Sequence, residues 1–574
     1  MTPDCIISQS NSTYYIKGSE EIAAETPLTL KKLETRRYLT RNYERLIIVL
    51  VGLPARGKSF ISRKLQNFLS WSGHQCRTFN VGKYRRAVSS DTTNCAADFF
   101  DLKNEEASAL RQQAAELALR DMLKWLDQHE PGSSIGRDRI AIFDATNSTN
   151  QRRSWILEES TSPIKRAGKP TGVVFVESIC DDEELLRQNY LVKVRTSPDF
   201  VGMEEVDALE DLKKRVAKYE EAYETVTDDS QSYIKIFNLS SKLMVNHIYG
   251  RMAKVIVPAI MAWNVGTRPV FLCRPGKTPR CVQTDEEDYP LVRHTRSMSE
   301  NSINNLRKAE KLGSDGVRFR DALEAFIALE GSEFLQKQQA IASHPSLYTG
   351  TSVTGLSSYQ EEVGLKGKEL PFAFTLLSST MPRAADTLMW ERSCFPVSMN
   401  PHLNPLDKGD FTGMELDEIQ EVDPDWYNRL VRDPYSTRFP GGESYKDLIR
   451  RLESPIIDLE QQTAPVLIVS HVSVLQALIA YFRQTPPQEC MNIEIPMHTV
   501  LKFTPSRGGG WIETRHDLLP EAQSEVSLSS KTESFLKSES SLSHISIAES
   551  LSSSPIWGDY VSSSPHTARA IRPI

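Results

Sequence analysis

The chain has 574 residues, of which 39% are hydrophobic and 25% charged, and its formal net charge is −7 at pH 7. This length exceeds what one hydrophobic core usually supports, so we expect about two domains with additional tails. The acidic balance argues against a general nucleic-acid-binding protein, which would usually be basic.

The N-terminus and the cysteine pattern both favour a cytoplasmic location. Residues 1–5 lack the basic and apolar stretches of a secretory signal, and the longest apolar runs are too short to span a membrane. The eight cysteines are scattered without a Cys-x-x-Cys pair, so their spacing predicts neither a zinc site nor a disulfide framework. We therefore expect a cytoplasmic protein with no membrane partner and no nucleic-acid partner.

Residues 1–44 form a polar N-terminal extension. Its basic segment, residues 31–37, could contact an acidic partner or could be a solvated lead-in to the first strand.

A phosphate-binding motif follows between a predicted strand and a predicted helix. The apolar run 46–51 predicts a buried parallel strand, and residues 60–69 have apolar side chains at helical spacing. Between them lies Gly52-Leu53-Pro54-Ala55-Arg56-Gly57-Lys58-Ser59, which matches Gly-x-x-x-x-Gly-Lys-Ser. Lys58 can reach the outer phosphates of a nucleotide and Ser59 can ligate Mg²⁺. We predict a nucleoside triphosphate site, with a chance match in a glycine-containing turn as the alternative.

Basic residues follow the next predicted strand, at residues 75–81. Arg85 and Arg86 come just past its carboxyl end, where open α/β sheets bind ligands. Beside a phosphate-binding loop they suggest an acceptor that carries a phosphate, and a solvated surface pair is the alternative. Residues 104–126 predict a long helix that contains Arg111.

A second apolar strand, residues 139–144, ends in Asp144. A carboxylate at this position holds or orients Mg²⁺ in nucleotide-binding domains, whereas capping of the next helix is the alternative role. Thr146 and Arg152 follow on the same loop and helix start, where they can meet an acceptor.

The remaining elements complete an α/β kinase domain over residues 45–265. They are a strand at 172–180, a helix that starts at Asp181-Asp182 and holds Asn189 and Lys193, a helix at 211–219, and a closing strand at 234–239. In the helix at 211–219, Arg215 and Tyr219 are four residues apart and share a face.

These motifs together resemble the 6-phosphofructo-2-kinase/fructose-2,6-bisphosphatase family. The resemblance spans about residues 45 to 505, and the motifs occur in order. It rests on the runs 51–59, 79–82 with 84–86, 143–147, 177–181, 245–246, 272–274 and 440–445.

The resemblance implies that ATP is the donor and that the acceptor is the 2-hydroxyl of fructose 6-phosphate. The product would be fructose 2,6-bisphosphate, which regulates glycolysis. Residues matched to the family's sugar-phosphate contacts are Arg85, Arg111, Thr146, Arg152, Lys193, Arg215 and Tyr219. Asn189 is matched to an ATP contact, and Lys58, Asp144 and Cys180 fall at catalytic positions. A strand-end cysteine such as Cys180 is, however, more often part of the core. Asp144 could act as a base, but holding the metal is the simpler role.

Residues 268–515 predict a second α/β domain, which by resemblance has the histidine-phosphatase (phosphoglycerate-mutase-like) fold. Where the family has Arg-His-Gly with the nucleophilic histidine, this chain has Arg274-Pro275-Gly276. The family's Leu-Asn-Glu, which carries the acid, is replaced by Leu403-Asn404-Pro405. Its Ser-His-Gln-Ala-x-x-Arg run loses both Gln and Arg within residues 470–476.

These losses predict an inactive phosphatase domain, and in this the chain resembles a fungal-type member of the family. Arg274, Arg383 and His471 survive and could hold a phosphate without hydrolysing it.

The inserts 277–304 and 344–364 are expected to be surface loops. Residues 516–574 are serine-rich and predict a disordered tail, where Ser554 and Ser564 precede proline and could be substrates of regulatory protein kinases. The family also suggests a homodimer.

Two other functions fit part of the pattern. One is a P-loop kinase for another hydroxyl, such as a nucleic-acid 5′ end, which the acidic charge disfavours. The other is a catalytically weak regulatory protein that binds ATP and sugar phosphate. The intact Lys58, Ser59 and Asp144 favour an enzyme.

Overall fold

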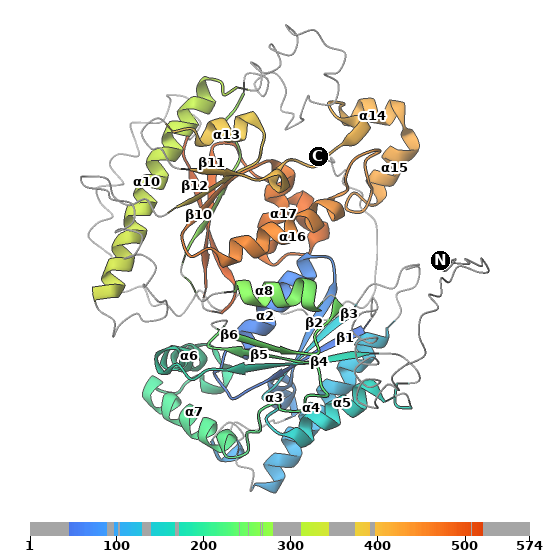
Figure 1. Cartoon of the computed structure of the whole chain (residues 1–574), viewed down its shortest axis with the longest axis vertical. Helices are drawn as coiled ribbons and strands as arrows, with labels where there is room; N and C mark the ends of the chain where they lie inside the picture. The colour runs from blue at the N-terminus through green and yellow to red at the C-terminus, as the bar shows by residue number, and fades with distance from the viewer. Residues whose placement is uncertain are drawn as a thin grey trace, which may run out of the picture.

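The computed structural model describes residues 45–88, 97–100, 104–128, 139–162, 164–166, 171–239, 242–250, 252–263, 266, 268–278, 311–343, 374–390, 396–506 and 508–519. Two α/β domains are stacked along the long axis of the molecule (Figure 1). The N-terminal extension, nearly all of the two inserts and the serine-rich tail beyond residue 519 lie outside the described residues, so the predictions for them stay predictions.

The first domain is built on a six-stranded sheet in the order β2-β3-β1-β4-β5-β6. Its strands are β1 (Arg45–Val51), β2 (Gln75–Asn80), β3 (Arg139–Asp144), β4 (Gly172–Ile179), β5 (Tyr233–Phe237) and β6 (Lys242–Asn246). β1 lies in the centre, parallel to β3 and β4, and every one of its residues is buried. This position explains why β1 is a continuous apolar run without alternation.

Helices cover both faces of this sheet. On one face, α2 (Lys58–Trp71) and α8 (Val257–Ala262) pack over the even-numbered apolar residues of β1. On the other, α4 (Glu105–Asp127) packs over the odd-numbered ones, and α5 (Asn150–Thr161) adds Ile156. The other elements of the domain are α3 (Val81–Val88), η2 (Ala97–Phe100), α6 (Glu183–Thr196), η3 (Pro198–Phe200), α7 (Glu205–Glu220) and the π-helical turn η4 (Met252–Ile256).

One local expectation for the first domain was wrong. The strand predicted to close the sheet, β5, is followed by β6, which pairs with it antiparallel and forms the edge. β6 lacks a clear apolar pattern because it lies at the edge, where Met244 and Val245 are exposed. The segment after β2 is the short helix α3, which carries Arg85 and Arg86 in its last turn.

The second domain has a six-stranded sheet in the order β12-β11-β7-β10-β8-β9. Its strands are β7 (Val270–Cys273), β8 (Thr375–Ser378), β9 (Val397–Met399), β10 (Val466–Val469), β11 (Thr499–Pro505) and β12 (Trp511–Asp517). Strands β7, β10, β8 and β9 are parallel, and β11 and β12 are antiparallel. The expected tail boundary at residue 516 is two residues early, because β12 pairs with β11 up to Asp517.

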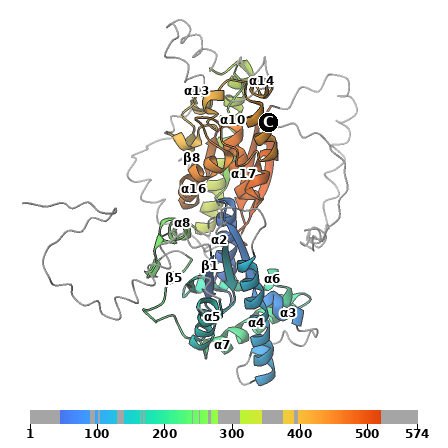
Figure 2. The same ribbon diagram turned by 90° about the vertical axis from the view of Figure 1, so that its right-hand side faces the viewer.

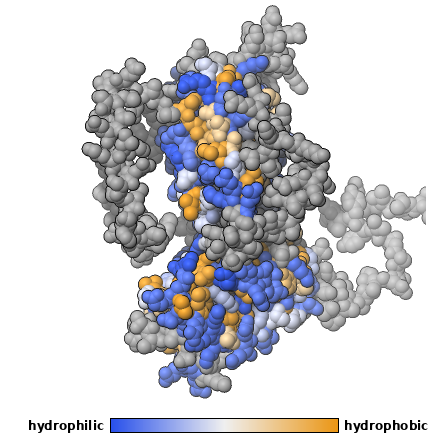
Figure 3. All heavy atoms as spheres, turned by 90° about the vertical axis from the view of Figure 1, so that its left-hand side faces the viewer, coloured by the Kyte–Doolittle hydropathy of each residue, from blue (hydrophilic) through white to orange (hydrophobic). Residues whose placement is uncertain are grey.

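The two faces of the second sheet are covered by different helices. α10 (Ser314–Ser343) and α13 (Pro382–Leu388) pack on one face, and α16 (Tyr445–Gln461) and α17 (Val472–Arg483) pack on the other. Smaller elements are η7 (Pro401–Leu403), η8 (Gly409–Phe411), α14 (Leu416–Val422), α15 (Pro424–Arg432) and η9 (Pro487–Asn492). On the side that includes α10, hydrophobic residues are interspersed with hydrophilic ones (Figure 3).

The two domains share one hydrophobic core. Apolar residues of α2 and α8 belong to the same buried cluster as those of α16 and α17. Figure 2 shows α2 between the sheet of the first domain and the helices of the second. Among the described helices, none is long and apolar enough to cross a membrane. The described cysteines Cys76, Cys180, Cys273 and Cys490 are free thiols.

Candidate active site

The phosphate-binding loop connects β1 to α2 through two glycines with positive φ. Gly52 has φ 138°, and a Cβ there would lie 2.5 Å from the carbonyl oxygen of Ser178. Gly57 has φ 88°, and a Cβ there would lie 2.4 Å from Leu239 Cδ2. Neither position admits a larger residue, so the loop keeps the tight curl that directs backbone N–H groups at phosphate.

Lys58 is the first residue of α2 and is almost completely buried, with 8% exposure. Its Nζ donates a hydrogen bond to the carbonyl oxygen of Leu53, at 2.5 Å. Burial lowers the pKa of Lys58 to about 7, and the nearby Asp144 carboxylate opposes this shift. A bound anion would therefore strongly stabilise the charged ammonium form of Lys58.

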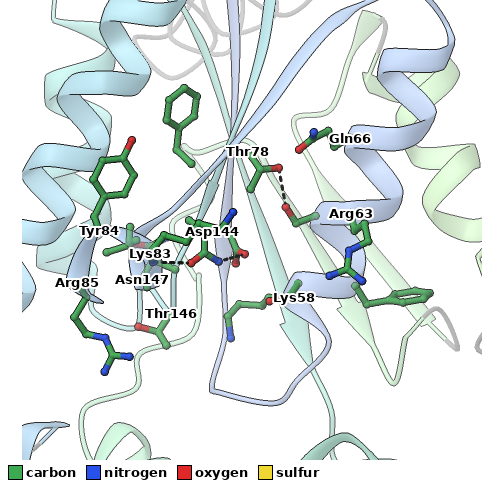
Figure 4. A pocket seen from close by; sticks show the side chains of 18 of the residues that line it. Lys58, Arg63, Gln66, Thr78, Lys83, Tyr84, Arg85, Asp144, Thr146 and Asn147 are labelled. Carbon is green, nitrogen blue, oxygen red and sulfur yellow. Dashed lines mark hydrogen bonds between the residues drawn. The ribbon is translucent and has the colours of Figure 1, made fainter. Parts of the chain in front are cut away.

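Asp144 ends β3 directly opposite the last residue of β2. The register pairs it with Asn80, whose Nδ2 donates to Asp144 Oδ2 at 2.6 Å (Figure 4). The carboxylate is buried, yet it lines the pocket next to the phosphate-binding loop. Asn80 thus fixes one oxygen of Asp144 and leaves the group able to bind a cation.

Ser59 and Asp144 fit the needs of Mg²⁺. The hydroxyl-bearing Ser59 is exposed at the pocket wall, and Asp144 supplies a carboxylate from the neighbouring strand. Mg²⁺ prefers oxygen ligands and usually takes only one or two from the protein, with the rest from phosphates and water. Within the described ranges, no three His, Cys, Asp or Glu side chains are grouped to hold a metal.

A large pocket of about 2630 Å³ opens beside the phosphate-binding loop. Asp144 lies between Thr146 and Lys58, and Arg85 lies beside Thr146 on the side away from Lys58 (Figure 4). All seven residues matched to sugar-phosphate contacts line this pocket: Arg85, Arg111, Thr146, Arg152, Lys193, Arg215 and Tyr219. They come from α3, α4, the loop after β3, α5, α6 and α7, so the fold brings together residues that are 134 positions apart.

The cations on one wall of the pocket converge on Asp199, a residue of η3. Arg85 Nη2 lies 2.6 Å from Asp199 Oδ2, Arg86 Nη1 lies 3.2 Å from Oδ1, and Arg215 Nη1 lies 3.3 Å from Oδ2. Although burial alone would raise it, the pKa of Asp199 is lowered by these arginines. Arg85 keeps a buried Nη1 that has no hydrogen-bond partner among the described residues.

Aromatic rings and a tyrosine hydroxyl also line this wall. The guanidinium of Arg215 lies over the rings of Phe100 and Phe200, at 4.8 and 4.6 Å. Tyr219 is hydrogen-bonded to Thr146, and its pKa is raised by burial. Burial also lowers the pKa of Arg152, which lies opposite Tyr219. The wall is therefore preorganised and positively charged, as recognition of a phosphorylated acceptor requires.

Asn189 and Lys193 lie one turn apart on α6 and both line the pocket. Asn189 Nδ2 is buried and has no hydrogen-bond partner in the described part of the chain. Burial lowers the pKa of Lys193, while the carboxylates of Asp144 and Asp199 oppose the shift. Both side chains are thus able to gain a partner from a bound ligand.

Several predicted site residues are not part of the pocket wall. Gly52 and Leu53 are needed for the shape of the loop, and Arg56 is directed at Tyr190 Oη (3.1 Å) and Glu220 Oε1 (3.4 Å). Cys180 is buried outside the pocket wall, and burial raises the pKa of its thiol to about 11. Its geometry gives the catalytic assignment no support.

Sequence reasoning missed two residues of the site, Asn80 and Asp199. The strand-end position of Asn80, parallel to the end of β3, was a usable signal. Asp199 follows Ser197-Pro198 and reads as an ordinary turn, so only the folded structure reveals its three arginine partners.

The second domain gathers Arg274, Arg383 and His471 at the carboxyl edge of its sheet. Arg383 Nη2 lies 3.3 Å from His471 Nδ1, and Ser379 Oγ lies 2.8 Å from His471 Nε2. Because arginine can only donate, Nδ1 must accept, and Nε2 then carries the proton. His471 has 0% exposure, and Arg274 donates to the carbonyl oxygen of Ile495.

The residues that replace the phosphatase groups are buried in the second domain. Pro275 and Pro405 are buried. Gln476 is buried as well, accepts a hydrogen bond from Tyr445 and donates to the carbonyl oxygens of Met491 and Ile493. Proline at 275 offers no imidazole, and proline at 405 offers no carboxyl group.

The fold and site together define a P-loop kinase domain followed by a histidine-phosphatase-type domain. Family models agree: residues 34–267 match 6-phosphofructo-2-kinase, and residues 358–518 match the histidine phosphatase superfamily, branch 1. The chain belongs to the 6-phosphofructo-2-kinase/fructose-2,6-bisphosphatase family, and its first domain is the 6-phosphofructo-2-kinase domain.

Three relatives illustrate the extent of the match. A 6-phosphofructo-2-kinase/fructose-2,6-bisphosphatase of Aquarana catesbeiana is 33% identical over 82% of this chain and 84% of its own length. The Arabidopsis thaliana protein of the same name is 34% identical over 80% of this chain, which spans only about half (52%) of that relative. A Schizosaccharomyces pombe protein, described as a probable 6-phosphofructo-2-kinase, is 31% identical over 81% of this chain and 72% of its own length.

Among solved structures, a mycobacterial glucosyl-3-phosphoglycerate phosphatase is 18% identical, with a TM-score of 0.28, over 44% of this chain and 99% of that one.

Proposed function

We propose that this chain transfers the γ-phosphate of ATP to the 2-hydroxyl of fructose 6-phosphate and so makes fructose 2,6-bisphosphate. The observation that carries the proposal is the single pocket that joins the two halves of such a site. One half is the phosphate-binding loop with Lys58, Ser59 and Asp144, and the other is the cationic wall around Asp199. A kinase whose acceptor is itself phosphorylated needs both.

The residues of the chain act by positioning and by charge. The loop between Gly52 and Gly57 holds the ATP phosphates through backbone N–H groups, and Lys58 approaches the group in transfer. Arg85 and Arg215 hold the acceptor phosphate from the opposite wall. The transferring group then lies between two fixed sets of cations, which stabilise its charge in the transition state.

Mg²⁺ would be held by Ser59 and Asp144, and when bound it neutralises charge on the ATP phosphates. Asn80 keeps Asp144 oriented for that role through the 2.6 Å hydrogen bond.

An assay with the purified chain tests the proposal. ATP, Mg²⁺ and fructose 6-phosphate are supplied, and fructose 2,6-bisphosphate is quantified. We expect product from the natural chain and none from Lys58→Met, which keeps the length of the side chain but removes its charge. ATP binding without product would instead favour the regulatory protein that binds ATP and sugar phosphate.

We further propose that the second domain no longer hydrolyses fructose 2,6-bisphosphate. Hydrolysis in the histidine-phosphatase manner needs an accessible imidazole as nucleophile. Pro275 occupies that position, and His471 is buried with Ser379 and Arg383 at its two ring nitrogens. When the bisphosphate is supplied alone, we expect no release of phosphate. Release would show that another group serves as nucleophile.

Four further expectations belong to the same proposal. We expect a cytoplasmic enzyme that uses no nucleic acid, assembles as a homodimer, and receives phosphate from protein kinases on its serine-rich tail. The acidic charge and free thiols support the first two expectations. Size-exclusion chromatography with light scattering tests the dimer, and phosphopeptide mapping of the tail tests the modification.

A further inference from the structure

Helix α2, which begins with Lys58 and Ser59, also packs against the second domain. On one face of α2 lie Phe60, Lys64, Asn67 and Trp71, spaced four, three and four residues apart, which is the spacing of a single helical stripe. This stripe faces α16, α17 and the β11–β12 turn of the second domain, and α2 lies between the two domains in Figures 1 and 2. We call these four residues the α2 stripe.

The α2 stripe contacts the second domain along its whole length. Asn67 Nδ2 donates to the carbonyl oxygen of Tyr481 at 3.0 Å, and Trp71 Nε1 donates to that of Ala477 at 2.7 Å. At the start of the helix, a Cβ on Gly509 would lie 3.3 Å from Phe60 Cδ2. The contacts therefore run from the first turn of α2 to its last residue.

A buried ion pair forms the centre of this contact. Lys64 Nζ lies 2.7 Å from Glu460 Oε1, and both side chains are only 5% exposed. Tyr481 Oη donates to the same carboxylate oxygen at 2.6 Å, and Lys64 Nζ lies 5.0 Å from the centre of the Trp511 ring. Removing one partner of a buried pair leaves the other charge without compensation, which is strongly unfavourable. The pair therefore resists separation of the domains.

A neighbouring face of α2, about 100° round the helix axis from the α2 stripe, packs on the kinase sheet. Ile61, Leu65 and Phe68 are buried in the cluster that contains the even-numbered residues of β1. α2 has 14 residues and is thus about 21 Å long. A shift imposed on one face of such a rigid element moves its first residues, Lys58 and Ser59, together with the rest.

We propose that the second domain positions α2 for ATP binding, and that Glu460 and Trp71 are positioning residues that act through Lys58 and Ser59. A domain without phosphatase chemistry then still contributes to the kinase, as a fixed support for its nucleotide half. The inference rests on the proposed function only in taking ATP as the ligand of the phosphate-binding loop. The cationic wall around Asp199, which we call the acceptor wall, lies outside this contact. It carries Arg85, Arg111, Arg152, Lys193 and Arg215 on α3, α4, α5, α6 and α7.

The experiment compares full-length Glu460→Gln with the natural chain. Binding of ATP with Mg²⁺ is measured by calorimetry without acceptor, and steady-state kinetics give KM for fructose 6-phosphate. We expect the Kd for ATP to rise at least fivefold, while KM for fructose 6-phosphate stays within twofold. If Glu460→Gln does not fold, Trp71→Phe is the second variant. It loses the bond to Ala477 and part of the buried ring that packs against Tyr481, and it should raise the Kd for ATP two- to fivefold.

Glu513→Gln is the matched control. It removes a carboxylate from an exposed pair with Arg483 in the same domain, a pair that makes none of the contacts with α2 described above, and should leave both constants unchanged. Unchanged ATP affinity in Glu460→Gln and Trp71→Phe would overturn the inference, even if the melting temperature falls. An equal loss for ATP and acceptor would also overturn it, because it would indicate general loosening. If the natural chain binds ATP but does not phosphorylate fructose 6-phosphate, the proposed function fails. The Kd values for ATP of the natural chain and the variants still test the inference in that case.

Discussion

Arg85 and Asp199 form an ion pair of 2.6 Å in the acceptor wall, and Arg86 and Arg215 reach the same carboxylate. One negative group thus holds three cations that would otherwise repel one another. Because Arg85 uses Nη2 for this pair, its buried Nη1 remains available to a ligand. Asp199 therefore orients Arg85 without consuming its capacity to bind phosphate.

Asp199→Asn should weaken binding of fructose 6-phosphate. The variant keeps the size of the side chain but turns charge-assisted hydrogen bonds into weaker ones, each worth about 1.5–3 kcal/mol in the charged form. We expect KM for fructose 6-phosphate to rise about ten- to a hundredfold, with KM for ATP nearly unchanged. Steady-state kinetics with each substrate varied in turn measure this split.

Glu205→Gln is the control for Asp199→Asn, since it breaks an exposed pair with Arg195 outside the pocket wall. It should behave as the natural chain does. A decrease in KM for fructose 6-phosphate in Asp199→Asn would show instead that the carboxylate competes with the substrate phosphate.

Much of the fold was predictable because local signals and tertiary structure agree. The apolar run of β1, the glycines after it and Asp144 at the end of β3 are local signals of two adjacent parallel strands. The sequence therefore predicted that Lys58, Ser59 and Asp144 lie together, and the structure places all three in one pocket. The edge strand β6 was missed because exposed positions such as Met244 erase the apolar pattern.

The contacts that could not be predicted are those between distant segments. Asp199 acquires its role only when α3 and α7 bring Arg85 and Arg215 beside it. Glu460 reads as one more charged residue in α16, and nothing nearby in the sequence reveals that Lys64, 396 residues away, is its partner. Pairings of this kind depend on packing between elements, which carries no local pattern.

Affinity for ATP should fall as pH rises through 7. In the ligand-free chain the pKa of Lys58 is about 7, so the ammonium form is lost above that pH. The phosphates of ATP favour the charged form, and binding therefore takes up a proton. Above pH 7 we expect the Kd for ATP to increase by up to about tenfold per pH unit.

Calorimetry in buffers of different ionisation enthalpy measures the proton uptake directly. Lys58→Arg keeps a charge at all these pH values and should abolish the uptake, although its different shape is expected to lower turnover. Proton release on ATP binding, or an affinity independent of pH between 6 and 9, would contradict the role of Lys58.

Cys180→Ala should leave the kinase reaction nearly unchanged. The thiol lies outside the pocket wall, and because burial raises its pKa to about 11, it is protonated near pH 7. We expect kcat and both KM values to stay within about twofold, with a small loss of stability from the lost packing. A decrease in kcat of more than tenfold at unchanged melting temperature would restore the catalytic assignment.

Pro275→His alone should not restore hydrolysis of fructose 2,6-bisphosphate. The change supplies an imidazole at the position of the nucleophile, but Pro405 still offers no acid to protonate the leaving oxygen. Gln476 is also committed to Tyr445 and to the carbonyl oxygens of Met491 and Ile493, so it cannot replace the missing arginine. Incubation with the bisphosphate should therefore release no phosphate. A phosphorylated protein that forms without turnover would show that the new histidine is accessible and that the acid is the next missing group. Steady release of phosphate would show that one substitution had silenced the domain.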